Sequence, residues 1–254
     1  MKISIITVSY NSAETIGQTI DSVLSQRFGD FEYIIVDGAS TDGTVNIIRE
    51  KEALFSGSLS WISEPDQGIY DAMNKGIAMA RGEIIGILNS DDFYKSSQVL
   101  NTVNNTFDKE NCDAVYGDIE FISPEDHRMI RYWKSSPYVP GGFLHGWHLP
   151  HPSFFVKQAV YEKFGVFDTN FGISADFELM LRLVEKQQIK VEYIPETLVL
   201  MTYGGESTGS IRNIIRGNLS VLKAFKKHNF KVNPIGYLTS RFVGKLKQFN
   251  TQTV

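Results

Sequence analysis

The sequence predicts an α/β fold with a central, mostly parallel sheet flanked by helices. Between residues 3 and 92, apolar runs rich in β-branched residues alternate with segments whose apolar residues recur at helical spacing. Three expected strands end in polar, turn-rich segments, at residues 7–11, 37–44 and 89–92. The chain has 254 residues, 42% of them hydrophobic, and can bury a large core without disulfides. Ligands of such sheets bind beyond the carboxyl ends of the strands, where we expect the site.

The first strand is expected at residues 3–8, an apolar run. Asn11, followed three residues later by Glu14, resembles a capping box and predicts the start of a helix. This helix would bury a stripe formed by Ile16, Ile20, Val23 and Leu24. The alternation continues with strands at 31–36, 59–62 and 83–88 and helices at 45–51 and 69–80, the second of which Gly82 can end.

After residue 110 the pattern is less regular. The expected elements are strands at 114–122, 153–156 and 191–201, a loop-rich stretch at 123–152, and a helix at about 175–186. No segment between residues 92 and 175 has the polar, Gly/Ser-rich composition of a linker. We therefore expect one integrated domain over residues 1–206, with halves that meet near residue 110.

Residues 207–254 form a basic C-terminal region. They carry nine of the 25 Lys and Arg residues and none of the 29 acidic residues. Two amphipathic helices are expected, at 211–228, with the stripe Ile211, Ile214, Ile215, Leu219, Leu222 and Phe225, and at 237–249. Such helices can lie in an anionic membrane interface. They can equally pack on the acidic body of the protein, and the sequence favours neither interpretation.

The single cysteine, Cys112, excludes a disulfide framework and a cysteine-based zinc site, and it indicates a reducing compartment. The N-terminal apolar run is too short for a signal peptide, and no stretch approaches the roughly 18 apolar residues of a membrane-spanning helix. We expect a cytoplasmic protein, peripheral at the inner face of the plasma membrane if the C-terminal helices bind lipid, and no nucleic-acid partner.

The strand-end residues have the chemistry of a metal and nucleotide site. Asp91 and Asp92 stand beside Asn89 and offer the oxygen ligands that Mg²⁺ and Mn²⁺ prefer. Taken alone, an Asp-Asp pair is more often a turn or a helix cap. Asp37, with Gly38 next to it, can contact a nucleobase or ribose at close range because glycine lacks a Cβ. An ordinary turn is the alternative there.

Five segments taken together are more specific than any one of them. They are residues 7–11 (TVSYN), 36–44 (VDGASTDGT), 66–76 (DQGIYDAMNKG), 80–83 (ARGE) and 88–92 (LNSDD). In order and spacing they resemble family 2 of the nucleotide-sugar glycosyltransferases, including members of bacterial polysaccharide and cell-envelope glycan biosynthesis. The resemblance covers about the first hundred residues. It implies a single domain of the GT-A fold and inverting transfer of a sugar.

The resemblance also implies a role for each matching residue. The nucleotide-sugar site would consist of Thr7, Ser9, Asn11, Asp37, Asp66, Gly68, Asn74 and Asp91. Within it, Asp37 would contact the base or ribose, and Asp66 with Gly68 would lie near the ribose and phosphates. Asp91 and Asp92 would bind Mg²⁺ or Mn²⁺, with Asp92 the more direct ligand. Residues 1–110 would bind the donor and residues 111–206 the acceptor.

This chain departs from the family pattern at two positions. Many members have a second acid after the first in the base-binding loop, where this chain has Gly38, so the base is left open. Some members have a further Asp before the metal pair, where this chain has Asn89. An amide oxygen still suits a hard cation.

Asp176 stands near the start of the helix expected at 175–186. An acid in this place is often only a partner of the helix dipole. By resemblance it is the general base, and a carboxylate can accept the proton that an acceptor hydroxyl loses. His151 and Trp147 are the expected acceptor-binding residues, with packing in a loop as the alternative. A metal site made of His145, His148 and His151 is not expected, because prolines and Gly146 prevent a shared helix face.

We therefore expect a metal-dependent, inverting glycosyltransferase that moves a sugar from a nucleoside-diphosphate donor to a hydroxyl of a saccharide or lipid-linked acceptor. A nicotinamide-dependent oxidoreductase is disfavoured because no G-x-G-x-x-G follows the first strand. Two alternatives remain, a nucleotidyltransferase and a non-catalytic sugar- or nucleotide-binding module. The first lacks a glycine-rich phosphate loop at residues 7–14, and the second has less need of a remote Asp176.

Overall fold

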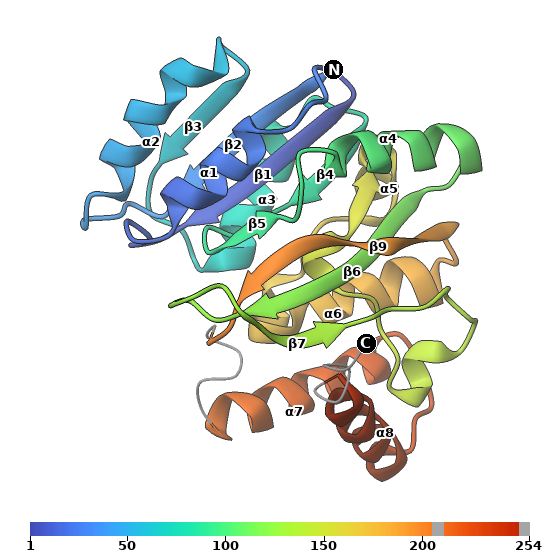
Figure 1. Cartoon of the computed structure of the whole chain (residues 1–254). Coiled ribbons are helices and arrows are strands. Elements are labelled where there is room, and N and C mark those ends of the chain that lie inside the picture. The colour runs from blue at the N-terminus through green and yellow to red at the C-terminus, as the bar shows by residue number, and fades with distance from the viewer. Residues whose placement is uncertain (205–210, 249–254) are drawn as a thin grey trace.

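The computed structural model describes residues 1–204 and 211–248, which form one nine-stranded sheet with helices on both faces (Figure 1). The strand order is β3-β2-β1-β4-β8-β6-β9-β5, and β7 also pairs with β6. The strands are β1 (Ile3–Ser9), β2 (Phe31–Asp37), β3 (Leu59–Ser63), β4 (Ile84–Ile87), β5 (Asp92–Tyr94), β6 (Ala114–Ile122), β7 (Met129–Trp133), β8 (Phe155–Lys157) and β9 (Val191–Thr202). The helices are α1 (Ile16–Leu24), α2 (Thr44–Glu52), α3 (Ile69–Met79), α4 (Val99–Glu110), α5 (Gln158–Phe164), α6 (Ala175–Met180), α7 (Ile211–Lys227) and α8 (Pro234–Lys247).

The first half of the chain is regular. Strands β1 to β4 are parallel, and the strand order reverses at β1, which lies between β2 and β4. Alternate side chains of β1 enter different cores, because successive residues of a strand point to opposite faces. Ile3 and Ile5 share a cluster with α1, α2 and α4, whereas Ile6 and Val8 share one with α3. The strands and helices predicted for residues 31–88 are confirmed.

The predicted start of the first helix is wrong. Helix α1 begins at Ile16, and Asn11 has a left-handed φ of 49°. The Asn11 side chain accepts a hydrogen bond from the Thr41 N–H (2.9 Å) and thus joins two loops instead of capping a helix. Asn tolerates this conformation because its short polar side chain can hydrogen-bond nearby backbone. Helices α4 and α5 and strands β5 and β7 are additional to the prediction, and β7 lies within the stretch 123–152 that was expected to be loop-rich.

The second half completes the sheet with mixed pairing. Strand β8 runs antiparallel to both β4 and β6, whereas β6 and β9 are parallel. Every antiparallel pair among the described strands includes β5, β7 or β8. The helix predicted at 175–186 is α6, continued by a π-helix, Leu181–Lys186. The predicted α/β class with a flanked central sheet is confirmed.

The C-terminal helices pack on the body of the protein. Helix α7 lies against α6 and the 3₁₀ segment Thr169–Ser174. Its buried face comprises Val221, Ala224 and Phe225. The predicted stripe is therefore only partly correct, because Ile215 and Leu219 are 55% and 62% exposed. The predicted boundary after residue 206, and the side chains of Ile211, Ile214 and Phe249, lie outside what the structure describes.

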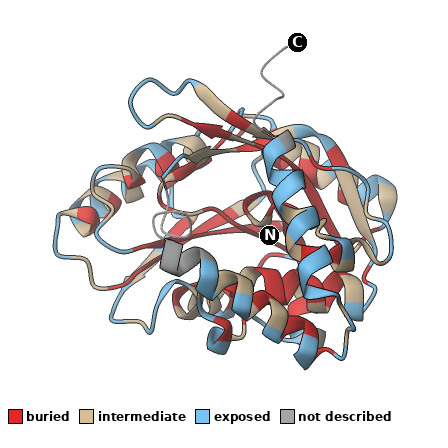
Figure 2. Ribbon diagram, turned by 90° about the horizontal axis from the view of Figure 1, so that it is seen from below, coloured by how far each residue is buried: buried red, intermediate tan, exposed pale blue. Residues whose placement is uncertain are grey.

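Both C-terminal helices turn an exposed side outward, as Figure 2 shows from the end of the molecule where they lie. The large apolar side chains exposed on α8 are Ile235, Phe242, Val243 and Leu246. None of the helices in residues 1–204 and 211–248 is both long and apolar enough to cross a membrane. Cys112 is a buried free thiol, and burial raises its pKa to about 11.

Candidate active site

Hydrogen bonds join the loops that follow β1, β2 and β4 at one edge of the sheet. The Asn11 N–H donates to Ser40 Oγ (2.8 Å), which connects the loops after β1 and β2. Ser12 Oγ lies 2.9 Å from Ser90 Oγ, which connects the loop after β1 to the Asn89–Asp92 segment. The sequence predicted this convergence, since parallel strands present their carboxyl ends at the same edge.

Asp37 is fully buried at the end of β2, opposite Ser9 in the strand register. Oδ1 accepts hydrogen bonds from Ser9 Oγ (3.0 Å) and Ser40 Oγ (2.5 Å). Oδ2 accepts from Ser40 N (2.9 Å) and Ser63 Oγ (2.6 Å). Asp37 and Ser9 therefore hold the strand ends together in this structure.

Asp66 belongs to the loop before α3, and its side chain lies close to Gly38, the residue after β2. Its Oδ1 accepts a hydrogen bond from the Gly68 N–H (2.8 Å). Gly68 precedes α3 with a φ of 110°, a conformation that glycine adopts readily. A Cβ placed on Gly38 would lie only 2.6 Å from Asp66 Oδ2. The two nucleotide-binding residues predicted in this loop are thus brought to the strand edge.

Asn89, Asp91 and Asp92 form the centre of the candidate metal site. Asp92 is 1% exposed, and its Oδ2 accepts a hydrogen bond from Asn89 Nδ2 (3.1 Å). The Oδ1 atoms of Asp92 and Asn89 are both buried without a hydrogen-bond partner. Burial raises the pKa of Asp92 well above its usual value, and the charge of Asp91 raises it further. Hard cations prefer oxygen ligands, and an oxygen without a hydrogen-bond donor is available as a ligand, so these residues fit Mg²⁺ or Mn²⁺.

A metal bound here would need further ligands. The described residues contain no group of three His, Cys, Asp or Glu side chains placed to hold a metal ion. Mg²⁺ is usually bound through one or two carboxylates together with substrate phosphates and water. Substrate phosphates and water would have to supply the remaining ligands of an ion held by Asp91 and Asp92.

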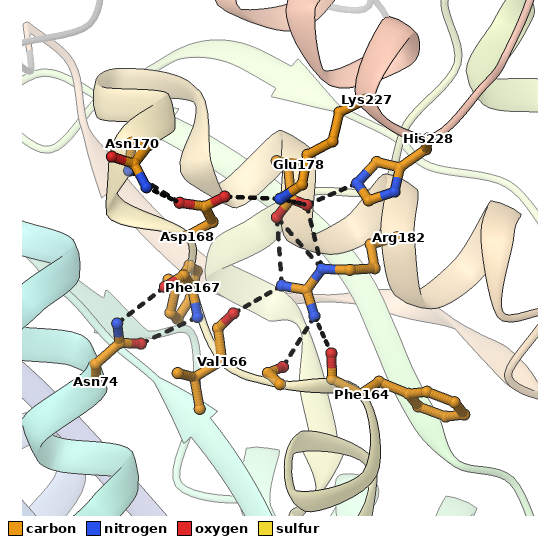
Figure 3. A network of polar contacts seen from close by, with 11 residues as sticks. Asn74, Phe164, Val166, Phe167, Asp168, Asn170, Glu178, Arg182, Lys227 and His228 are labelled. Atoms are coloured by element: carbon orange, nitrogen blue, oxygen red, sulfur yellow. Dashed lines mark hydrogen bonds and ion pairs between the residues drawn. The ribbon is translucent and has the colours of Figure 1, made fainter.

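Two predicted nucleotide-binding residues, Thr7 and Asn74, form hydrogen bonds within the protein. Thr7 is fully buried, and its hydroxyl accepts a hydrogen bond from the Tyr33 OH (2.9 Å). Asn74, on α3, bonds the backbone of Phe167 at both its N–H (3.0 Å) and its carbonyl (2.9 Å), as Figure 3 shows. Asn74 thus fastens α3 to the segment that leads to α6.

Asp176 lies at the start of α6, partly buried, and its Oδ1 accepts a hydrogen bond from the Phe177 N–H (2.7 Å). His151 lies near it. Burial lowers the pKa of His151, and the Asp176 carboxylate acts in the opposite direction. The His151 ring meets Phe167 edge to face at 5.7 Å, so the residue held by Asn74 also borders this pair. The predicted base and one predicted acceptor residue are therefore neighbours.

Trp147 lies in an aromatic cluster of the second half. Its ring packs against Tyr116, Tyr138 and Phe143, and its indole N–H donates to Ser136 Oγ (3.0 Å). His148 lies between Trp133 and Phe177, where burial lowers its pKa to about 3. His145 is exposed, so the three histidines at three-residue spacing lie in different surroundings.

One group of residues at the site was not predicted. Glu178, two residues after Asp176, is fully buried and is bound by Arg182 of the π-helix and by Lys227 and His228 at the end of α7 (Figure 3). It accepts hydrogen bonds from His228 Nε2 (2.7 Å), Arg182 Nε (3.2 Å) and Lys227 Nζ (3.3 Å). Lys227 also pairs with Asp168 (2.6 Å). The i,i+4 spacing of Glu178 and Arg182 was visible in the sequence, but the contact with α7 was not.

The comparisons with known proteins agree with this geometry. A family model described as Glycosyl transferase family 2 matches residues 4–177. The chain belongs to glycosyltransferase family 2. One family relative, an uncharacterized glycosyltransferase of Mycobacterium tuberculosis, is 34% identical over 183 residues, or 71% of this chain and 68% of that protein. A PGL/p-HBAD biosynthesis glycosyltransferase of Mycobacterium bovis is 27% identical over 192 residues, or 75% of this chain and 73% of that protein.

Solved structures of glycosyltransferases share the fold. Residues 1–349 of S. aureus TarS in complex with UDP-GlcNAc align with a TM-score of 0.70 at 17% identity, covering 96% of this chain and 73% of that one. The mannosyltransferase PcManGT of Pyrobaculum calidifontis, in complex with GDP-Man and Mn²⁺, aligns with a TM-score of 0.67 at 17% identity, covering 100% and 76%. The predicted GT-A fold of family 2 is confirmed.

Proposed function

We propose that this family 2 glycosyltransferase is a metal-dependent, inverting enzyme whose donor is a nucleoside-diphosphate sugar. The observation that carries the proposal is the pair of buried, unpartnered oxygens on Asp92 and Asn89 at the edge of the sheet. The titles of two neighbours in the fold support it, since TarS is seen with UDP-GlcNAc and PcManGT with GDP-Man and Mn²⁺. We assign donor binding to residues 1–110 and acceptor binding to residues 111–206.

In the proposed reaction, the acceptor oxygen forms a bond to the anomeric carbon while the bond from that carbon to the diphosphate oxygen breaks. The proton of the acceptor hydroxyl passes to the Asp176 carboxylate, which acts as general base. Asn89, Asp91 and Asp92 would hold Mg²⁺ or Mn²⁺, which would offset the negative charge on the departing nucleoside diphosphate. A single displacement inverts the configuration and needs no covalent intermediate.

The acceptor is proposed to be a saccharide hydroxyl, on a lipid-linked glycan precursor. His151 would lie beside its hydroxyl groups, since it neighbours Asp176. Trp147 belongs to the half of the chain that we assign to the acceptor. Its ring packs against Tyr116, Tyr138 and Phe143, so we assign it a supporting role in acceptor binding. The Mycobacterium bovis relative is named a PGL/p-HBAD biosynthesis glycosyltransferase, which supports a biosynthetic role for the proposed transfer.

The assignment of Asp176 is tested by Asp176→Asn with a panel of nucleoside-diphosphate sugars and Mg²⁺ or Mn²⁺. We expect kcat for transfer to fall by about 10²- to 10⁴-fold, the usual contribution of a general base, with donor affinity unchanged. Asp126→Asn, at an exposed carboxylate, is the matched control. Intact transfer in Asp176→Asn excludes this base. Donor binding without transfer in the unaltered protein favours a non-catalytic module, and release of diphosphate from a nucleoside triphosphate favours a nucleotidyltransferase.

We further propose that the C-terminal region, residues 207–254, holds the enzyme peripherally on an anionic membrane, at the cytoplasmic face. The exposed apolar side chains of α7 and α8 lie in a region with nine cations and no acidic residue, a composition that complements anionic lipid. The structure also shows this region bound to the body through Lys227 and Phe225. Packing on the body and contact with lipid therefore use different faces of the same helices.

The membrane proposal is tested by flotation with vesicles of phosphatidylglycerol or of phosphatidylcholine alone. We expect binding to the anionic vesicles only, and we expect replacement of Phe242 and Leu246 by Ser to weaken it by about tenfold, because each exposed side chain loses apolar contact. Replacement of Leu54, an equally exposed apolar residue on the far half of the chain, is the control. Equal recovery with both vesicle types, or with neither, contradicts the proposal.

A further inference from the structure

The contact between Gly38 and Asp66 indicates which carboxylate faces the donor base. Asp66 Oδ2 occupies the space that a side chain at position 38 would fill, since a Cβ there would lie 2.6 Å from this oxygen. The same Cβ would lie 3.3 Å from the ring of Tyr10. Glycine at 38 therefore lets a carboxylate from the loop before α3 reach the end of β2, beside the exposed ring of Tyr10.

Asp37 has no oxygen left to offer. Each of its carboxylate oxygens accepts two hydrogen bonds from the protein, and the residue is 0% exposed. A ligand would have to displace Ser9, Ser40 or Ser63 to reach it. Breaking such bonds in a buried place leaves polar groups unsatisfied, which is costly.

Asp66 is in the opposite situation. Its Oδ1 is fixed by the Gly68 N–H, and its Oδ2 accepts no hydrogen bond from the residues that the structure describes. Lys75, whose charge interacts with Asp66, is held by Glu64 (2.8 Å) and by the carbonyl of Pro65 (2.9 Å). Asp66 is also partly exposed, so Oδ2 is both oriented and accessible.

We propose that Asp66, and not Asp37, recognises the base of the donor by accepting a hydrogen bond from a base N–H at Oδ2. Gly38 leaves the space that this carboxylate occupies. The inference rests on the proposed function. One free carboxylate oxygen matches one N–H, as in the imide of uracil or thymine. Guanine presents two adjacent donors, which suit a carboxylate with both oxygens free, and cytosine has an acceptor in place of the imide N–H.

The test compares the binding of UDP and N3-methyl-UDP, with Mn²⁺, by isothermal titration calorimetry. Methylation removes the N–H and leaves the ribose and diphosphate unchanged. We expect the unaltered protein to bind UDP about 10- to 100-fold more tightly than N3-methyl-UDP, the range of a hydrogen bond to a charged group. In Asp66→Asn we expect the affinities for the two ligands to lie within about twofold. The amide oxygen can still accept from the Gly68 N–H, which leaves the amide nitrogen, a donor, facing the base.

Three controls separate the base from other contacts. Asp71→Asn changes a neighbouring carboxylate that bonds the Gln67 N–H (3.1 Å), and it should discriminate like the unaltered protein. Gly38→Ala should lose discrimination, because its Cβ must displace Oδ2. Comparison of UDP with 2′-deoxy-UDP should give the same ratio in the unaltered protein and in Asp66→Asn if Asp66 does not contact the ribose.

The outcomes are distinct for the two proposals. If the unaltered protein binds no nucleoside diphosphate with Mn²⁺, the proposed function fails. If it binds UDP but discrimination against N3-methyl-UDP persists in Asp66→Asn, or if CDP or GDP binds more tightly than UDP, the donor proposal stands and the role of Asp66 is overturned. If the ratio of the affinities for UDP and 2′-deoxy-UDP differs between the unaltered protein and Asp66→Asn, Asp66 contacts the ribose instead of the base.

Discussion

Two buried carboxylates, Asp92 and Glu178, differ in what surrounds them. Asp92 is 1% exposed, accepts a hydrogen bond from Asn89 at Oδ2, and has its Oδ1 buried without a side-chain donor. Glu178 is 0% exposed and is bound by Arg182, Lys227 and His228. Burial acts to raise both pKa values, but hydrogen bonds from His228 and Arg182 and the charge of Lys227 lower that of Glu178 overall.

We interpret the difference as that between a proposed ligand-binding residue, Asp92, and a residue that stabilises the fold, Glu178. A buried ion without a partner is unfavourable unless something else provides the opposite charge. For Asp92 we propose that a bound divalent cation provides this charge. For Glu178 the protein itself supplies the opposite charges. The same contacts join α6, the helix that contains Asp176, to the end of α7 (Figure 3).

The largest effect is expected from Asp92→Asn. Transfer measured as kcat/KM should fall by about 10³-fold, because metal stabilisation of the leaving group contributes several kcal/mol. The melting temperature without metal should stay equal or rise, since the substitution removes a buried charge that no cation balances. The increase in melting temperature that Mn²⁺ and UDP together give the unaltered protein should be lost.

Asp108→Asn, at an exposed carboxylate that pairs with Lys2, is the control for this variant. A lower melting temperature in Asp92→Asn without metal would make Asp92 a structural residue like Glu178, and the contrast between the two would be lost.

The first half of the fold could be read from the sequence because each element there obeys a local rule. Strand runs such as residues 31–36 and stripes such as Ile16, Ile20 and Val23 need no distant contact to be recognised. Helix α4 was missed although Val99, Val103 and Phe107 have helical spacing. The capping box at Asn11 was wrong because that residue bonds across to Thr41, a contact between loops that spacing does not report.

The site divided in the same way. Sequence motifs alone were enough to select Asp91, Asp92 and Asp176 as candidate site residues. Other contacts join residues that are up to 50 positions apart in the sequence. Three serines bond the carboxylate of Asp37, Asp66 lies against Gly38, and His228 contacts Glu178. Such contacts are set by the packing of the whole chain, which no pattern within one segment reveals.

A smaller effect, on stability instead of catalysis, is expected from Glu178→Gln. At pH 7 the free energy of unfolding should fall by about 3 kcal/mol, because the substitution removes the charge that pairs with the partly buried Arg182 and the carboxylate that His228 Nε2 contacts. The folded protein lowers the pKa of Glu178, so its ionised form contributes stability above the unfolded pKa of 4.5 and loses it as the pH falls through the folded pKa. Urea unfolding of both proteins between pH 7 and pH 3 measures this.

The difference between the unaltered protein and Glu178→Gln should therefore be full at pH 7 and shrink as the pH falls below about 4.5, the unfolded value. Glu162→Gln, at an exposed carboxylate on α5, should leave stability unchanged at every pH. A difference that stays constant with pH would show that Glu178 acts through its shape and not its charge. A residual kcat near that of the unaltered protein at temperatures where Glu178→Gln remains folded would confirm that this carboxylate, unlike Asp92, supports the site without taking part in the reaction.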